Sequence, residues 1–322
     1  MTPELFADIE GDGEIALVNE LGYEKARARL KKHRDSFIRE EDFVTIKDRE
    51  FDFVRLPVGY WLFEETDDFI DGEDYIRRAF TWASQNHLGV VLDFHGLQGS
   101  QNGYDHSGQP GKIRLYRRHN RKRALRTLEY LCRAYGKEEA LIGFEIINEP
   151  QIRLWLYDWW RVLGFYSHAV RLAERLLRPE TKIIASDAFH PIKMARALAR
   201  KGYGHRVVMD MHLYRMFGER HQGMRHPEHV AGVEKEWHEV LSQVTKFVPV
   251  MIGEWSAALP AAAYKELDED KEIACVKYFH SQQKLFDEVS WAHSYWSYKA
   301  PTNGVWDSRK ILELARKHRK NI

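Results

Sequence analysis

The stretch LIGFEIINEPQ, residues 141–151, begins as an apolar run and ends in polar and charged residues. A short run rich in Ile, Leu and Phe is typical of a parallel β-strand that is covered on both faces. Asn148 and Glu149 follow this run, and Pro150 then ends it. A carboxylate at the end of a buried strand costs desolvation energy unless it is paired or chemically useful, so Glu149 is a candidate functional residue.

Six other segments have the same strand-like character, and amphipathic helices separate them. One helix is expected over 159–177, where apolar residues recur on one stripe. Strictly alternating strands and helices predict an α/β fold with a parallel sheet, and so many repeats in one chain favour a (β/α)8 TIM-type barrel. The seven predicted strands are residues 51–58, 89–95, 141–147, 181–186, 206–212, 248–254 and 291–298.

Composition limits the kinds of partner that the protein can have. The chain has 322 residues, with 49 basic and 48 acidic side chains and a net charge of +1. This balance predicts no nucleic acid partner and no membrane partner, because neither polyanion would be attracted electrostatically. The two cysteines, Cys132 and Cys275, lie in helix-like segments and are expected to be buried free thiols.

No targeting segment is evident in the sequence. There is no apolar run of about 18 residues, and the N-terminus lacks the basic and apolar regions of a signal peptide. A cytoplasmic location is therefore expected for the chain as it stands. Secretion stays open if the natural N-terminus lies upstream.

Polar and aromatic residues recur at the ends of the predicted strands. In a (β/α)8 barrel the carboxyl ends of all strands meet on one face, where active sites are found. Each residue taken alone has an ordinary structural explanation, but their agreement across the strands predicts a site. The strand-end set is Arg55, His95, Asn148, Glu149, Ser186, Asp187, His212, Tyr214, Glu254 and Trp296.

Two carboxylates in this set suggest a reaction. Glu149 and Glu254 lie 254 − 149 = 105 residues apart, each at the end of a strand. Cleavage of a glycosidic bond requires one carboxyl group that donates a proton and a second that attacks or stabilises the anomeric carbon. A helix-capping role for Glu254 remains an alternative explanation.

A metal site is the competing hypothesis for the histidines. Asp93 and His95 lie on one face of a strand, and Asp210 and His212 repeat the same Asp-x-His spacing. Histidine is a common metal ligand. The His-x-His pair typical of barrel metallohydrolases is missing, however, so we expect no metal and no other cofactor.

The segment after His95 predicts a binding loop. It is long, rich in glycine and full of amides and hydroxyls, and such loops are usually functional. Hydrogen-bonding groups in it suit sugar hydroxyls, and one ring suits a sugar face. A flexible insertion is the alternative. The residues concerned are Gln101, Asn102, Tyr104, Asp105 and His106.

Six stretches in this order resemble glycoside hydrolase family 5, the retaining (β/α)8 glycosidases. The most similar branch is that of the exo-β-1,3-glucanases and related β-glucosidases. The resemblance covers nearly the whole chain and implies a single glycoside hydrolase catalytic domain over residues 1–322. The matching stretches are VRLPVGYW, LDFHGLQGSQNGYDHSG, EIINEP, DMHLYRMF, IGEWSAAL and WSYK.

The resemblance also implies residue roles. Glu149 would be the acid/base and Glu254 the nucleophile, with Arg55 beneath Glu254. Asn148, His95 and His212 would bind sugar hydroxyls, Tyr214 would hydrogen-bond the nucleophile, and Trp296 would form the floor of the same subsite. Tyr104 and Phe217 match two aromatic residues that clamp the next sugar, and Asp105 and His106 lie beside them.

The sequence departs from the family pattern in two places. Lys299 is followed by Ala300 and Pro301 instead of Thr and Glu, which leaves the linkage preference open. The chain also starts where relatives have just completed a first strand, which would account for seven strands instead of eight. On this basis the N-terminus is expected to be truncated.

The expected activity is retaining hydrolysis of β-glucosidic bonds, most simply exo-action on β-1,3-glucan or short β-glucosides. Hydrolysis of β-1,6- or β-1,4-linked glucan, or of a glucolipid, is an alternative activity with the same mechanism. A barrel that binds sugar without turnover is a third hypothesis. The expected partner is a β-glucan oligosaccharide or β-glucoside.

Overall fold

The computed structural model describes residues 3–11, 13–64, 66–203, 206–265, 267, 269–300 and 304–319. The chain forms two compact units, residues 1–189 and 190–322, and each is described by itself. Pro301, at the departure from the family pattern, and Met1 and Thr2, at the expected truncation, lie outside the described residues.

The first unit contains four parallel strands that pair in chain order. The strands are β1 (Phe53–Gly59), β2 (Gly89–Gly96), β3 (Leu141–Glu145) and β4 (Lys182–Ser186). The longer helices are α1 (Glu14–Leu21), α2 (Tyr23–Phe37), α3 (Glu40–Asp48), α4 (Glu73–Gln85), α5 (Arg118–Tyr135) and α6 (Trp155–Leu176). Three short 3₁₀ turns are η1 (Pro3–Phe6), η2 (Tyr60–Leu62) and η3 (Asp105–Ser107).

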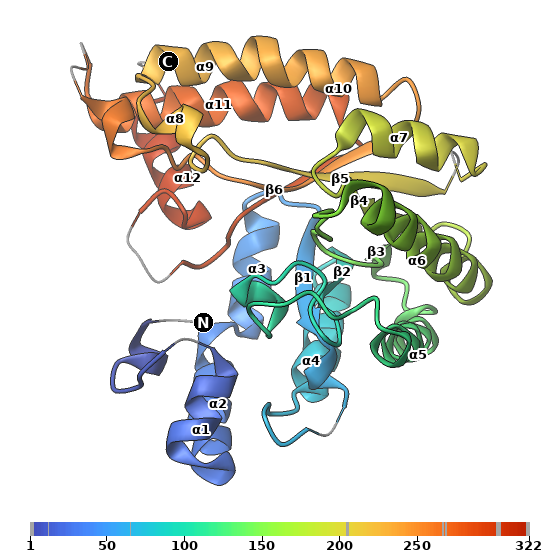
Figure 1. Ribbon diagram of the computed structural model, residues 1–322. Helices are drawn as coiled ribbons and strands as arrows, with labels where there is room; N and C mark the ends of the chain where they lie inside the picture. Colours follow the sequence, from blue (N-terminus) through green and yellow to red (C-terminus); the bar gives the residue numbers. More distant parts are fainter. Residues whose placement is uncertain are drawn as a thin grey trace. The chain divides into compact units, whose positions relative to one another are not determined.

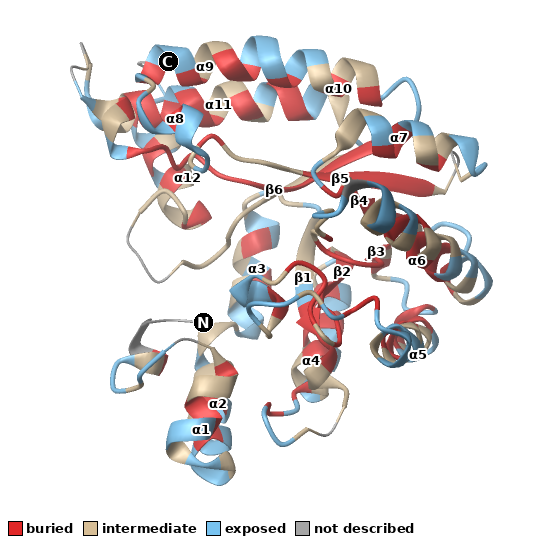
Figure 2. Ribbon diagram, in the orientation of Figure 1, coloured by how far each residue is buried: buried red, intermediate tan, exposed pale blue. Residues whose placement is uncertain are grey.

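Burial explains why these residues form strands and helices. In β2 every residue from Val90 to Gly96 is buried, as Figure 2 shows in red, which suits a strand covered on both faces. The apolar stripe of α6 is buried as well, including Val162, Tyr166 and Val170. Hydrophobic burial therefore holds the two kinds of element together, and the polar strand ends are left to form the site.

The second unit contains three parallel strands, which also pair in chain order. They are β5 (Val207–Leu213), β6 (Val250–Trp255) and β7 (Ala292–Tyr295). The helices are α7 (Pro191–Arg200), α8 (Glu219–Gln222), α9 (His226–Gly232), α10 (His238–Val244), α11 (Lys271–Val289) and α12 (Ser308–Lys317). A π-helical turn, η4 (Val233–Trp237), joins α9 to α10, and η5 (Ala261–Tyr264) is a short 3₁₀ turn.

An aromatic core fixes the end of β6 in the second unit. In Figure 1, α9 and α10 follow one another in a line, and α11 lies beside them along β5 and β6. Trp255, the last residue of β6, is 2% exposed and packs against Phe279, Phe286 and Tyr295 at ring separations of 5.4, 5.3 and 4.9 Å. Burial of these large rings holds the neighbouring Glu254 in a defined place.

The sequence predictions agree with the described structure in number and order of strands. All seven predicted strands are present, and Cys132 and Cys275 are buried free thiols as expected. The last predicted strand was too long: β7 ends at Tyr295, because Ser297 exchanges backbone hydrogen bonds with the segment around Trp306 and Ser308. Among the helices that the structure describes, none has the length and apolar character needed to cross a membrane.

Candidate active site

A buried arginine organises the strand ends of the first unit. Arg55 on β1 donates to Glu145 Oε2 at 2.9 Å and to Asn148 Oδ1 at 2.9 Å, and its Nη2 lies 3.0 Å from Asp93 Oδ2. Its side chain is only 3% exposed. A buried guanidinium is tolerated when several well-placed acceptors surround it, and Arg suits this because its planar group donates in several directions.

Glu145 is a member of this network that sequence reasoning missed. It is fully buried in β3 and receives two bonds from Arg55, through Nε at 3.1 Å and Nη2 at 2.9 Å. The available signal was an acidic residue inside the otherwise apolar run LIGFEII, which predicts a buried ion pair. The sequence did not show that Arg55 is the partner in this ion pair.

Two histidine side chains link Asp93 to Glu149 in a continuous row. Asp93 Oδ2 lies 2.6 Å from His95 Nδ1, and His95 Nε2 lies 3.0 Å from His106 Nδ1. His106 Nε2 in turn lies 3.3 Å from Glu149 Oε2. The structure thus brings together four of the residues singled out in the sequence, and it places His106 beside the candidate acid/base.

Glu149 has an unusual backbone conformation. Its φ is +44°, in the left-handed region that residues with a side chain rarely adopt. Such a conformation costs on the order of 1–3 kcal/mol and is often found at functional sites. The neighbouring backbone is held in place, because Gln101 Nε2 donates to the Asn148 carbonyl at 3.0 Å.

Gln101 corrects one expectation about the loop. Its amide was expected to serve sugar hydroxyls, but it is fully buried and is used within the protein. Its Nε2 donates to the carbonyls of His95 and Asn148 at 2.6 and 3.0 Å, and its Oε1 accepts from Leu97 N at 3.2 Å. Gln101 therefore connects the ends of β2 and β3, and a sugar would have to break these bonds to reach it.

The rest of the loop is held close to β2, which argues against the flexible-insertion alternative. Ser107 is buried, and its Oγ lies 2.7 Å from Ser100 Oγ. Gly108 has φ +79°, and a Cβ there would collide with the indole of Trp61. The three intervening residues, Tyr104, Asp105 and His106, are exposed at the surface of this anchored loop.

In the second unit, Glu254 lies at the end of β6 and is 7% exposed. The Tyr214 hydroxyl donates to Glu254 Oε2 at 3.0 Å, and His212 Nδ1 lies 3.6 Å from the same oxygen. An irregularity in the register between β5 and β6 places His212 opposite Glu254. The carboxylate therefore has a fixed orientation, which contradicts a role as a simple helix cap.

Asp210 supports this arrangement from behind. Its Oδ2 lies 3.0 Å from His212 Nε2, and its Oδ1 accepts from Gly253 N at 2.6 Å. A Cβ on residue 253 would collide with the Asp210 carboxylate. Glycine before Glu254 is thus required for the close approach of the aspartate to β6.

Two aromatic rings lie beside Tyr214, the donor to Glu254. Tyr214 and Phe217 have ring centroids 5.4 Å apart, and Trp306 lies 5.8 Å from Tyr214 and 6.2 Å from Phe217. Sequence reasoning missed Trp306, because the segment before α12 carries no strand signal. Phe217 is 59% exposed and offers a ring face to solvent.

Several expected roles are not tested by the geometry within either unit. Tyr104 is 47% exposed in the first unit, whereas Phe217 belongs to the second, so the aromatic clamp stays a prediction. The placement of Arg55 beneath Glu254 stays a prediction for the same reason. Trp296 directly follows β7, and its backbone N–H donates to the Trp255 carbonyl at 2.8 Å.

The two Asp-x-His pairs fit hydrogen bonding better than metal binding. A metal would need a free lone pair on an imidazole nitrogen. In His95, however, Nδ1 faces Asp93 and Nε2 faces His106 at hydrogen-bond distance. In His212, Nε2 faces Asp210 at 3.0 Å, and Nδ1 lies 3.6 Å from Glu254 Oε2.

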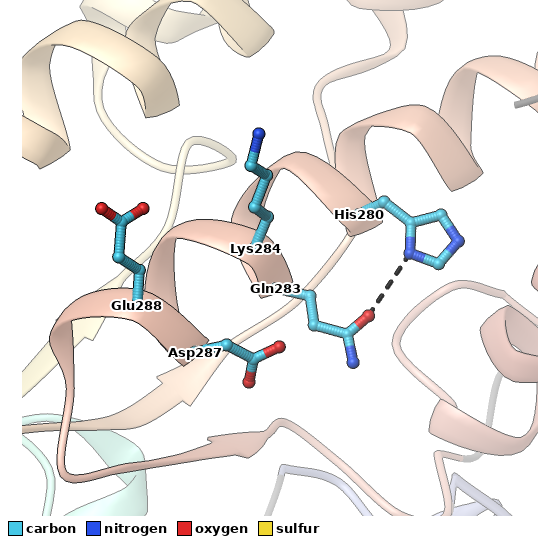
Figure 3. A pocket seen from close by; sticks show the side chains of 5 residues that line it. All are labelled: His280, Gln283, Lys284, Asp287 and Glu288. Carbon is cyan, nitrogen blue, oxygen red and sulfur yellow. Dashed lines mark hydrogen bonds between the residues drawn. The ribbon is translucent and has the colours of Figure 1, made fainter.

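A shallow hollow elsewhere on the surface contains none of the site residues. Figure 3 shows that it lies along α11 and that its side chains all come from this one helix. His280 Nδ1 and Gln283 Oε1 are 3.3 Å apart in it. Charges of both signs and an open surface are ordinary features of a solvated helix face. The lining residues are His280, Gln283, Lys284, Asp287 and Glu288.

Comparison with solved structures defines the class of fold. A rutinosidase from Aspergillus niger matches 97% of this chain and 92% of its own, with a TM-score of 0.76 at 16% identity. Cel5A from Thermotoga maritima matches 86% of this chain and 90% of its own, with a TM-score of 0.61 at 17% identity. The chain therefore has the α/β, (β/α)8 TIM-type fold that its sequence predicts.

Comparison of sequences identifies the family. The model of the cellulase family, glycosyl hydrolase family 5, matches residues 19–300. The chain belongs to glycosyl hydrolase family 5 and is a glycoside hydrolase by family, so the resemblance inferred from its motifs is confirmed.

Curated relatives carry related names. "Probable glucan 1,3-beta-glucosidase A" of Aspergillus niger is 32% identical over 269 residues, which are 82% of this chain and 63% of the relative. "Glucan 1,3-beta-glucosidase 2" of Wickerhamomyces anomalus is 28% identical over 97% of this chain and 82% of the relative. The chain thus spans less than two thirds of the Aspergillus niger protein.

Proposed function

We propose that this protein hydrolyses β-glucosidic bonds with retention of configuration, acting from the chain end on β-1,3-glucan or on short β-glucosides. The observation that carries the proposal is the contrast between the two strand-end glutamates. Glu254 accepts a hydrogen bond from Tyr214 in a buried position, whereas Glu149 faces the titratable His106. A retaining glycosidase needs two such carboxyl groups with different environments.

The proposed mechanism is a double displacement without a cofactor. Glu149 donates its proton to the leaving oxygen while Glu254 attacks the anomeric carbon, and water then releases the glycosyl group from Glu254. In this proposal both glutamates act on one bond, and residues 1–322 form a single catalytic domain; the barrel fold of the family supports this. The names of the curated relatives support a β-1,3-linked glucan as substrate.

The other residues have supporting roles in this proposal. Asn148, His95, His212 and Trp296 bind the sugar whose bond is cleaved. Tyr104 and Phe217 clamp the next sugar, and Asp105 and His106 lie beside it. Arg55 acts from within the first unit by orienting Asn148, whose Oδ1 it binds.

One observation favours a second candidate substrate, a β-glucoside with an apolar aglycone such as a glucolipid. Four large apolar side chains at the start of α6 lie exposed, five to eleven residues after Glu149 in the sequence. An apolar surface that follows the acid/base so closely suits an apolar leaving group. These residues are Leu154 (66% exposed), Leu156 (71%), Tyr157 (57%) and Trp160 (66%).

Proton NMR of a laminaritriose digest tests the proposal. Early release of β-glucose that later mutarotates would support retention, exo-action and β-1,3 specificity together. Early α-glucose would refute retention. Parallel digests of gentiobiose, cellobiose and an alkyl β-glucoside test β-1,6 linkage, β-1,4 linkage and an apolar aglycone. Binding of laminaritriose by calorimetry without any turnover would support the sugar-binding alternative.

A further inference from the structure

The row Asp93–His95–His106–Glu149 constrains where its protons lie. Asp93 Oδ2 forms an ion pair with Arg55, whose Nη2 is 3.0 Å away, and it lies 2.6 Å from His95 Nδ1. A carboxylate oxygen in this position is an acceptor, so the hydrogen of neutral His95 is on Nδ1. The lone pair of His95 is then on Nε2.

A second donor near His95 agrees with this assignment. Asn148 Nδ2 lies 3.5 Å from His95 Nε2. The amide has this orientation because its Oδ1 accepts from Arg55 at 2.9 Å. Both groups that face His95 Nε2 are therefore able to donate to it, and neither requires it to carry a hydrogen.

The constraint passes from His95 to His106. Because His95 Nε2 is an acceptor, His106 Nδ1, 3.0 Å away, must be the donor. Neutral His106 therefore has its lone pair on Nε2, which faces Glu149 Oε2 at 3.3 Å. This last contact is a hydrogen bond only when one proton lies between the two atoms, either on the carboxyl group or on the imidazole.

We propose that Glu149 and His106 share one exchangeable proton and that His106 is the positioning residue that holds it for the acid/base. This inference rests on the proposed function of Glu149. With the proton on Glu149, the glutamate is ready to protonate the leaving oxygen. With the proton on His106, the imidazolium donates through both nitrogens, to His95 and to the Glu149 carboxylate.

The proton balance of the reaction is unchanged by this pair. In the first step the proton of Glu149 passes to the leaving oxygen, the glycosidic bond breaks, and a bond to Glu254 forms. In the second step water gives a proton to Glu149, its oxygen attacks the anomeric carbon, and the bond to Glu254 breaks. Between these steps Glu149 and neutral His106 face each other with lone pairs only. This arrangement favours the return of a proton.

The surroundings of His106 suit this role. Its ring stacks on Tyr104 with centroids 5.6 Å apart and planes at 20°. Its side chain is 36% exposed, against 16% for Glu149, so the imidazole gives the pair access to solvent protons. Asn102 Nδ2 lies 3.4 Å from His106 Nε2 and donates to it when that nitrogen is unprotonated.

The charged groups around the pair within the first unit come from several elements. Each of them has an ionic or hydrogen-bonding neighbour of its own or lies next to the pair in sequence, so within the row the proton is undetermined at the Glu149–His106 contact. They are Arg55 on β1, Asp93 and His95 on β2, Glu145 on β3, Asp105 on η3 and Arg153 after Glu149, whose Nη2 donates to the Asn102 carbonyl at 3.2 Å.

A measurement that needs no turnover tests the coupling directly. Histidine side-chain ¹⁵N NMR of the full chain gives the tautomer and the titration midpoint of His106, assigned by its loss in His106→Asn. We expect the Nδ1–H tautomer for both His95 and His106 when neutral. In Glu149→Gln the midpoint of His106 should fall by at least about one pH unit, because a neutral amide replaces the carboxylate. An unchanged midpoint, or an Nε2–H tautomer for His106, would overturn the proposal.

A pH–rate profile tests the same pair in catalysis. In the wild-type enzyme the single proton of the pair lies either on Glu149 or on His106. Because two forms share this proton, the pair keeps it up to a higher pH than Glu149 alone would. We expect His106→Asn and His106→Gln to move the alkaline limb of kcat/KM for laminaritriose, whose leaving sugar needs a proton, about one unit toward acid pH. His119→Asn, the same change at an exposed histidine of α5, should leave the limb in place.

The two experiments separate the possible failures. A profile that is unchanged in both His106 variants would refute the role in catalysis. If the chain has no glycosidase activity, the NMR titration still decides whether His106 and Glu149 share a proton. An unchanged melting temperature in His106→Asn shows that a shifted limb does not reflect loss of folding.

Discussion

Two strands carry the same Asp-x-His spacing, and the structure uses the two pairs differently. On β2, Asp93 binds Nδ1 of His95, and the other nitrogen of that ring leads through His106 to Glu149. On β5, Asp210 faces Nε2 of His212, and Nδ1 then lies 3.6 Å from Glu254. The choice of ring nitrogen decides where the other nitrogen points.

The difference matches the two proposed chemical roles. Glu254 receives the Tyr214 hydroxyl directly and has its orientation fixed, as a nucleophile requires. Glu149 contacts an imidazole that both accepts and releases protons, as an acid/base requires. The same short sequence pattern thus supports two functions. In the first unit His106 lies between His95 and Glu149, whereas in the second unit His212 itself lies beside Glu254.

The largest expected effect comes from removing each carboxylate. Glu254→Gln should lower kcat by about 10⁵-fold for all substrates, because no nucleophile remains. Glu149→Gln should cost about 10²–10⁴-fold on laminaritriose, since general acid catalysis is lost. With an aryl β-glucoside whose leaving group needs no protonation, the Glu149 variant should lose much less in the first step. Equal losses in both variants with both substrates would contradict the assigned roles.

Replacing the two aspartates compares the supports behind the histidines. Asp93→Asn removes a charge from the buried Arg55 network and should lower the free energy of unfolding by about 3 kcal/mol. Asp210→Asn weakens bonds to Gly253 N and His212 and should cost about 1–2 kcal/mol. Urea denaturation measures both values. A larger loss of unfolding free energy for Asp210→Asn than for Asp93→Asn would contradict the importance assigned to the buried Arg55 network.

Tyr214→Phe removes the direct donor to Glu254 without changing the ring. A hydrogen bond to a charged group contributes about 1.5–3 kcal/mol, so kcat/KM should fall roughly 10- to 100-fold. Tyr130→Phe is a matched control, because the hydroxyl of Tyr130, at an exposed position of α5, also donates to a glutamate, Glu73 on α4, at 2.7 Å. That control should have wild-type activity, and a similar loss in it would point to a general folding defect.

The smallest effect concerns a histidine that has no carboxylate beside it among its described contacts. His229 is fully buried, and burial, followed by the nearby positive charge of Arg215, lowers its pKa to about 4. The unfolded chain binds this proton near pH 6.5. His229 therefore does not lower the free energy of unfolding above that pH, and it lowers it increasingly as the pH drops toward 4.

His229→Gln should therefore reduce the loss of unfolding free energy between pH 7 and pH 5 by at most about 2 kcal/mol. Urea titrations at the two pH values measure this difference. His168→Gln, at an exposed position of α6, is the control and should leave the loss unchanged. The same acid sensitivity in His229→Gln and the wild type would show that His229 does not contribute to it.

The sequence alone determined the strands, their order and the residues at their ends. This was possible because buried parallel strands are short apolar runs, and a polar residue that ends such a run stands out. Glu149, Glu254, His95 and His212 were all found in this way, and the motifs around them identified the family. Even Glu145, which was missed, carried a signal as a charge within an apolar strand.

Only the tertiary structure decided how these residues are used. Nothing in the spacing of Gln101 shows that its amide is bonded to two backbone carbonyls, and nothing near Trp306 shows that it approaches Tyr214. The two Asp-x-His pairs are indistinguishable in sequence. They differ because hydrogen bonds depend on the direction of individual atoms, which residues distant in the chain set together when they pack.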